Sequence, residues 1–153
     1  ANFHLPKTQS DLLKLKKTAL HDLTAELKAA VLNNRPQAVF MGNIYAEAVL
    51  RPEAERWFAQ SLSQTLADYD YTVIMAYPYM EKQGANARTW LRNLADSAGV
   101  NDPQVNKKVI FKLQKYDWQA KQAIGERELS AQIKVLQDCG VKNIAVYPES
   151  TRY

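Results

Sequence analysis

Two patterns of apolar and polar positions alternate along this chain. Four short, nearly continuous apolar runs predict buried strands, over 37–41, 72–76, 109–113 and 143–147. The segments around them carry apolar residues at helical spacing and predict helices, over 10–32, 52–69, 86–98 and 126–139. Strands that alternate with helices pair in parallel through right-handed crossovers. We therefore predict an α/β fold in the order α-β-α-β-α-β-α-β.

Three local features affect where functional side chains would lie. Gly42 and Asn43 follow the first apolar run and are interpreted as its exit turn. The polar segment from Lys115 to Gly125 is predicted to be a loop, and no hairpin signal is recognised in the chain. Trp57 and Trp90 fall on apolar helix faces and are predicted to pack in the core.

Two architectures fit this order of elements: a self-contained open sheet of four strands, or the C-terminal half of an eight-stranded, TIM-like (β/α)8 barrel. The first predicted element is a helix without a strand before it, and the last is a strand. We favour the half-barrel, as one partial domain over residues 1–153. Half a barrel exposes strand edges, so we expect the isolated chain not to be a stable monomer.

The predicted strands share a feature at their C-terminal ends. Three segments end in an aromatic residue beside a polar hydrogen-bonding group: Tyr71–Glu81, Lys108–Trp118 and Val141–Glu149. A fourth, Gln37–Glu47, follows the same scheme. Parallel strands place these ends at one edge, where α/β folds carry their active sites. Aromatic faces beside carboxylates suit sugar rings, so we predict a carbohydrate site.

Carboxylates at these strand ends are candidates for glycosidic chemistry, which needs an acid and a second polar group at the anomeric centre. Asp117 lies between Tyr116 and Trp118. It either contacts a sugar stacked on the aromatic rings or caps a backbone amide beside a core tryptophan, and the sequence leaves both open. Further candidates at the strand ends are Asn43, Glu47, Tyr77, Tyr79, Glu81, Gln114, Tyr147 and Glu149.

Composition narrows the functional classes. The chain has 153 residues, 46% of them hydrophobic, and a formal charge of +4 without long basic blocks. We expect no nucleic-acid partner. The single cysteine, Cys139, excludes a disulfide within the chain. No phosphate loop, dinucleotide glycine pattern or zinc-binding helix is present, and His4 and His21 are far apart, so we expect no cofactor and no metal.

The same strand-end segments resemble the C-terminal domain of the poly-beta-1,6-N-acetyl-D-glucosamine deacetylases of Gram-negative biofilm systems, the PgaB/HmsF type. Several segments of this length matching in order are more specific than one motif, and the resemblance runs from about residue 10 onwards. The matching segments are NIYAEAVLRPEAERWFAQ (Asn43–Gln60), YDYTVIMAYPYME (Tyr69–Glu81), VIFKLQKYDW (Val109–Trp118) and LQDCGVKNIAVYPES (Leu136–Ser150).

The resemblance implies a (β/α)8 barrel with an electronegative groove that binds and cleaves partially de-N-acetylated poly-glucosamine. It places the metal-dependent deacetylase in a separate N-terminal domain, which nothing in this chain resembles, and the principal catalytic acid upstream of Ala1. Family members often carry arginine where Gly42 stands and aspartate where Glu149 stands. The positions implied for the groove wall are Asn43, Tyr77, Tyr79, Glu81, Gln114, Trp118, Tyr147 and Glu149.

The resemblance also implies partners and a location. The partners are the glucosamine polymer, the rest of the barrel, the deacetylase domain and an outer-membrane export porin. The location is the periplasm, with attachment to the outer membrane through a lipoprotein N-terminus. Three hypotheses follow: a polymer-binding hydrolase domain, a non-catalytic module that binds carbohydrate or guides export, and an unrelated open-sheet domain for a small molecule. Convergence of Asn43, Tyr77, Gln114 and Tyr147 at one rim would discriminate among them.

Overall fold

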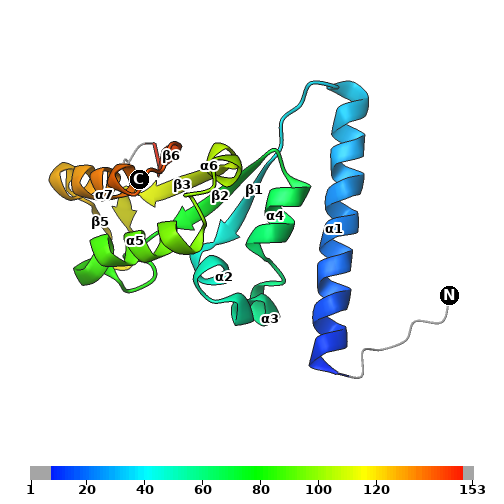
Figure 1. The fold of residues 1–153 in the computed structure, drawn as a ribbon, viewed down its shortest axis with the longest axis horizontal. Coiled ribbons are helices and arrows are strands. Elements are labelled where there is room, and N and C mark those ends of the chain that lie inside the picture. The colour runs from blue at the N-terminus through cyan, green and yellow to red at the C-terminus, as the bar shows by residue number, and fades with distance from the viewer. Residues whose placement is uncertain (1–7, 150–153) are drawn as a thin grey trace.

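The computed structural model describes residues 8–149 and has an α/β fold built on one parallel sheet (Figure 1). The sheet order is β1-β2-β3-β6, and all three strand pairs are parallel, as the sequence predicts. The central strand β3 pairs with β2 on one side and with β6 on the other. The four strands are β1 (Met41–Tyr45), β2 (Tyr71–Ala76), β3 (Val109–Gln114) and β6 (Ile144–Tyr147).

Helices connect the strands, and a small antiparallel pair of strands follows β3. The longer helices are α1 (Gln9–Asn34), α5 (Ala87–Ser97) and α7 (Glu126–Asp138). The shorter ones are α2 (Ala46–Leu50), α3 (Glu55–Phe58), α4 (Leu62–Asp68), α6 (Pro103–Lys108), and the 3-10 turns η1 (Pro52–Ala54) and η2 (Gly84–Asn86). The antiparallel pair consists of β4 (Tyr116–Asp117) and β5 (Gln122–Ala123).

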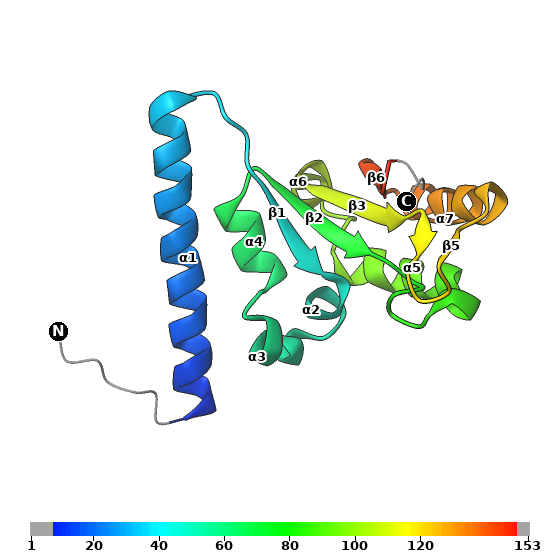
Figure 2. The same cartoon turned by 180° about the vertical axis from the view of Figure 1, so that it is seen from behind.

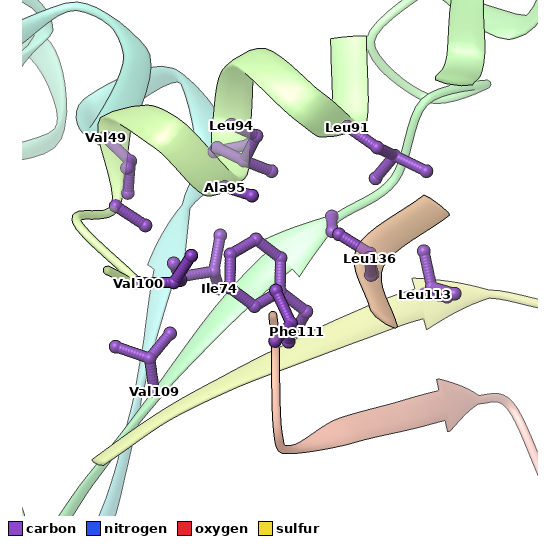
Figure 3. Packing of buried hydrophobic residues seen from close by; sticks show 14 of the residues in the cluster. Val49, Ile74, Leu91, Leu94, Ala95, Val100, Val109, Phe111, Leu113 and Leu136 are labelled. Carbon is purple, nitrogen blue, oxygen red and sulfur yellow. The ribbon is translucent and has the colours of Figure 1, made fainter. Parts of the chain in front are cut away.

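The hydrophobic core lies between one face of the sheet and helices α2, α5 and α7. Figure 3 shows Leu91 and Leu94 of α5 against Ile74 and Phe111 of the sheet, all four fully buried. Burial of such side chains stabilises the fold by about 1.5–3 kcal/mol each. Because side chains alternate along a strand, the residues between these core positions point to the opposite face of the sheet.

That opposite face is largely uncovered. Along β1, Ile44 is fully buried in the core, whereas Met41 is 59% exposed and Tyr45 is 41% exposed. Tyr71 of β2 and Tyr147 of β6 are exposed as well. An exposed apolar sheet face of this kind is the inner surface that a closed barrel would enclose.

Helix α1 lies at one end of the molecule beside α4, at the end opposite α7, as Figures 1 and 2 both show. None of its residues is buried. Lys17 forms an ion pair with Glu55 at 3.0 Å, and His21 lies 2.9 Å from Asp68. Its N-cap is Thr8, which forms a capping box with Asp11. Within residues 8–149, no helix has both the length and the apolar character needed to cross a membrane.

The first strand begins later than predicted. Residues 37–40 precede β1, and Gly42 and Asn43 lie inside the strand rather than in an exit turn. The ring of Tyr69 packs on Gly42 so closely that a Cβ atom there would lie 2.5 Å from Tyr69 Cδ2. The glycine is needed for close packing and not for a turn, a distinction that its sequence neighbours do not reveal.

The predicted helix over 52–69 is broken in two. Ala59 adopts a left-handed conformation at φ 52° and ends α3, and Ser61 then caps α4 through its side chain. The break leaves Trp57 66% exposed, so its predicted core position is wrong. Phe58 packs against the core instead, whereas Trp90 is partly buried against it as predicted.

The segment 115–125, predicted to be a loop, contains the β4–β5 hairpin. The sequence analysis recognises no hairpin, and this prediction is wrong. Each of its strands has two residues, too few for a periodic pattern to be recognised. Helix α6 was also missed, although Asp102 caps it and Pro103 occupies its first turn.

Candidate functional site

The C-terminal ends of the four parallel strands bring three of the predicted residues around a lysine that was not predicted. Lys112 Nζ donates a hydrogen bond to Asn43 Oδ1 at 2.7 Å. The same Nζ lies 5.8 Å from the ring centroid of Tyr77 and 5.4 Å from that of Tyr147. Both distances are within the range of cation–π attraction. These contacts join β1, the residue after β2, β3 and the end of β6.

Strand alternation explains why Lys112 points to this side. Its neighbours Phe111 and Leu113 are fully buried in the core under α5 and α7, so Lys112 emerges on the uncovered face. Asn43 is placed in the same way, between buried Gly42 and Ile44. Through β2, Asn43 is in register with Ile110, and Lys112 is in register with Tyr45. The long Lys112 side chain therefore reaches across β2 to bond Asn43.

Trp118 completes an aromatic group beside the lysine. Its ring centroid lies 5.8 Å from that of Tyr77 and 6.2 Å from that of Tyr147, and Tyr116 makes an edge contact at 6.2 Å. The Trp118 side chain remains 38% exposed, so part of its ring is open to a ligand. We call the group formed by Asn43, Tyr77, Lys112, Trp118 and Tyr147 the Lys112 site.

Asp117 fixes the turn that carries Trp118. Its Oδ1 accepts hydrogen bonds from the backbone N–H groups of Gln119 at 2.9 Å and Ala120 at 3.1 Å. This is the amide-capping geometry that the sequence left open beside a sugar contact. A sugar contact through the carboxylate stays a prediction.

Burial changes the proton affinity of two groups in the Lys112 site. It raises the pKa of Tyr77 to about 12, and the neighbouring Tyr147 adds to this effect. It lowers the pKa of Lys112 from its ordinary value, because a charged ammonium loses hydration at a half-buried position. Tyr77 is therefore a neutral hydrogen-bonding group over the whole physiological pH range.

Gln114 lies at the same rim, but its side chain turns under a loop. It is fully buried, and its Oε1 accepts from the N–H groups of Tyr79 and Met80 at 3.0 and 3.1 Å. Its Nε2 donates to the carbonyl of Tyr116 at 2.9 Å. Gln114 thus holds the segment after β2 and the hairpin after β3 together, and its amide is occupied by backbone groups.

Two other predicted residues, Tyr79 and Glu81, face other neighbours. The ring of Tyr79 packs on Gly84, and burial, with smaller effects of Glu128 and Asp117, raises its pKa. Burial likewise raises the pKa of Glu81, partly offset by Arg51. A raised carboxyl pKa is the direction that a general acid requires. The charged group acting on Glu81 is Arg51, which directly follows α2.

The remaining predicted carboxylates lie outside the Lys112 site. Glu47 forms an ion pair with Arg51 on the surface of α2. Glu149 is exposed and directly follows Pro148, at the limit of the described residues. Their roles toward a ligand stay predictions.

The sequence carries one signal that could have identified Lys112. A lysine in the middle of an apolar strand, on the face opposite Phe111 and Leu113, is costly unless polar groups or aromatic faces receive it. Strand alternation places it on the uncovered face, two residues before the strand end at Gln114. Asn43 on β1, two strands away, supplies the acceptor.

Metal binding finds no support in the part of the chain that is described. Among residues 8–149, no three His, Cys, Asp or Glu side chains gather as a metal site. His21 pairs with Asp68, and His4 lies outside the described residues. The expectations of no metal and no cofactor stay predictions.

Comparison with known proteins identifies the family. The model of hypothetical glycosyl hydrolase family 13 matches residues 3–147. The chain belongs to this family. The family match excludes the alternative of an unrelated open-sheet domain and agrees with a carbohydrate site at the strand ends.

The relatives of the chain are longer than the chain itself. It is 39% identical over 150 residues to the poly-beta-1,6-N-acetyl-D-glucosamine N-deacetylases of Escherichia coli K12 and O157:H7. The match covers 95% of this chain and 22% of each relative. The resemblance stated from the sequence is thereby confirmed.

A solved structure matches the fold. It is the PgaB (BpsB) glycoside hydrolase domain from Bordetella bronchiseptica, with a TM-score of 0.84 and 32% identity. The match covers 96% of this chain and 41% of that chain. The parallel four-stranded sheet together with this match is consistent with part of a TIM-like barrel.

Proposed function

We propose that this chain forms one wall of a groove that binds partially de-N-acetylated poly-beta-1,6-N-acetyl-D-glucosamine, within a barrel that hydrolyses the polymer. The observation that carries the proposal is the Lys112 site. Partly exposed aromatic rings and an amide converge there at the C-terminal ends of parallel strands, where a barrel enzyme binds its substrate. The polymer is taken from the names of the Escherichia coli deacetylases to which the chain is similar.

The chemistry of the site suits a sugar. The ring of Trp118 offers an apolar face to a pyranose, and Asn43 and Tyr147 offer hydrogen-bonding groups at its edge. Glu81, predicted at the same rim, provides a carboxyl group that attracts glucosamine ammonium groups when it is ionised. A polymer with both acetylated and free amines would thus meet different chemistry along the groove.

The proposal also covers the rest of the protein, its location and its partner. We place the principal catalytic acid and a metal-dependent deacetylase domain on other parts of the same protein. We place that protein in the periplasm, at the outer membrane, with an export porin as partner. The residues of this chain bind and orient the polymer.

Polymer binding is tested by comparing two tryptophans in the protein at its full natural length. We expect Trp118→Ala to weaken binding of a beta-1,6-linked glucosamine hexamer about fivefold or more, because aromatic stacking on a ring contributes about 1–3 kcal/mol. The matched control is Trp57→Ala, since Trp57 is 66% exposed on α3 and outside the Lys112 site. Isothermal titration calorimetry measures both. Equal losses, or no binding by the unchanged protein, would contradict the proposal.

A second candidate is a binding or export-guiding module without hydrolysis. It is favoured by one observation: Asp117, the carboxylate adjacent to Trp118, uses Oδ1 to cap a turn. Release of reducing ends from the polymer separates the two candidates. We expect the full-length protein to release them, and binding without any release would establish the module instead.

A further inference from the structure

Lys112 has no carboxylate partner among the described residues. The ion pairs within residues 8–149 involve other lysines and arginines, and the recorded contacts of the Lys112 ammonium are the amide oxygen of Asn43 and the faces of two tyrosines. Its positive charge is therefore not cancelled locally. Any ligand group that enters the Lys112 site meets this charge.

The lysine also decides which way the Asn43 amide is presented. An ammonium group can only donate hydrogen bonds, so Asn43 must turn its Oδ1 toward Lys112. The Nδ2 group of Asn43, with two N–H donors, is then directed away from the lysine. The polar groups that this pair offers to a ligand are consequently donors.

We propose that Lys112 is a positioning and specificity residue that makes this part of the groove select an N-acetylated glucosamine over a free-amine glucosamine. The inference rests on the proposed function and deepens it, because it assigns one substituent of the polymer to one position. The acetamide carbonyl accepts hydrogen bonds from Asn43 Nδ2, and its methyl group packs on the aromatic rings. The ammonium of a de-N-acetylated residue brings three more donors and a like charge.

Cation–π attraction is the effect that would favour the opposite selection. The faces of Tyr77 and Tyr147 would attract a sugar ammonium if they were empty. Lys112 Nζ already lies over both rings, at 5.8 and 5.4 Å, so a second cation would have to share them at close range. Repulsion between two unit charges within a few ångströms in a partly desolvated site exceeds the attraction that remains.

The burial of Lys112 supports the same direction. Its pKa is lowered by lost hydration, which means that the site already bears the cost of one poorly solvated cation. A second positive charge from the ligand would increase that cost. A neutral acetamide would not.

The experiment compares two hexamers of beta-1,6-linked glucosamine, one fully N-acetylated and one fully de-N-acetylated, with the full-length protein. The quantity measured is the ratio of their dissociation constants, free amine over acetylated. In Lys112→Met we expect this ratio to fall about tenfold, the size of one like-charge contact in a partly exposed site. Lys112→Arg keeps the charge, and we expect its ratio to stay within about twofold of the unchanged protein.

Two further variants make the result specific. Asn43→Asp places a carboxylate beside Lys112 and neutralises it, so we expect the ratio to fall here as well. It also tests the inference if Lys112→Met fails to fold. Lys134→Met removes an exposed lysine on α7 that pairs with Asp138, and we expect no change of the ratio.

The outcomes separate this inference from the function beneath it. If the unchanged protein binds but neither Lys112→Met nor Asn43→Asp alters the ratio, the inference is overturned and the proposed function stands. An equal fall in Lys134→Met would assign the effect to overall charge and would also overturn the inference. If the unchanged protein binds neither hexamer, both proposals fail.

Discussion

Tyr77 shows how one residue links the core to the Lys112 site. It follows β2 directly, and its side chain is 6% exposed, yet its ring contacts Trp118 and lies under the ammonium of Lys112. Burial and the neighbouring Tyr147 raise its pKa to about 12. The phenol therefore keeps its proton at pH values where an exposed tyrosine has lost it.

This raised pKa predicts a pH dependence of both ionisation and stability. The ordinary pKa of tyrosine is 10.0, and the pKa of Tyr77 in the folded protein is raised to about 12. Between these pH values Tyr77 ionises in the unfolded chain but not in the folded protein. Its contribution to the free energy of unfolding is therefore fully present below pH 10 and is lost as the pH rises to about 12. In an ultraviolet titration of tyrosinate, we expect Tyr77→Phe to remove the component that titrates last. The control, Tyr71→Phe, removes an exposed ring at the start of β2 and should leave that component in place. Its persistence in Tyr77→Phe would contradict the prediction.

Single residues at the site were predictable where a strand end places them. Asn43, Tyr77, Trp118 and Tyr147 were all proposed from the aromatic and polar pattern, and they lie together. Gln114 was placed at the correct rim, but strand alternation gives only the face of the sheet. It does not reveal that the segment after β2 folds over the side chain and takes its amide oxygen.

Elements were predictable where the apolar pattern is long or regular. Strands β2, β3 and β6 and helices α5 and α7 lie within a residue or two of their predicted ranges. The start of β1 is set by its pairing with β2, which begins at Met41 opposite Tyr71. The break at Ala59 had no sequence signal, because alanine rarely adopts the left-handed conformation seen there.

The packing of Gly42 gives a prediction at the level of this strand. We expect Gly42→Ala to lower the free energy of unfolding by about 1–3 kcal/mol, since the added Cβ would meet the Tyr69 ring at 2.5 Å. The matched control is Gly125→Ala, where no atom lies within 4 Å of the new Cβ and φ is −59°. We expect it to be neutral or to stabilise by up to about 1 kcal/mol. Denaturant titration measures both, and equal effects would show that the Tyr69 contact is not restrictive.

The same contact bears on the resemblance to the deacetylase family. An arginine at this position, as the family pattern implies, could not coexist with the ring of Tyr69 where it lies here. Gly42 shares the core face of β1 with Ile44, so this position lies on the face opposite the Lys112 site.

The whole molecule is one-sided. Helices α2, α5 and α7 cover one face of the sheet, and the other face exposes Met41, Tyr45 and Tyr71. In the described residues, β1 and β6 are edge strands that each pair with a single strand. On β1, the Gln60 side chain bonds the backbone of Asn43 and Tyr45 and so covers part of that edge. Exposed edges and apolar faces of this kind promote association.

We therefore expect the 153-residue chain, prepared alone, to self-associate at micromolar concentrations. Light scattering after size-exclusion chromatography measures the mass. Met41→Lys places a charge on the uncovered face and should reduce association. Leu15→Lys, on the exposed side of α1, tests whether that helix is responsible instead. A monomer with one cooperative melting transition would show that the uncovered face is tolerated.

The three hydrogen bonds of the Gln114 amide have a consequence for how a polymer chain would be received. They tie the backbone after β2 and the hairpin bearing Trp118 to one buried point, so the spacing between two aromatic walls is set when the protein folds. The conformational entropy of these two segments is then lost during folding, before any sugar binds. It therefore does not reduce the binding free energy of each sugar unit. A fixed spacing between the two segments would suit a polymer of identical units, because each unit would meet the same arrangement of aromatic side chains.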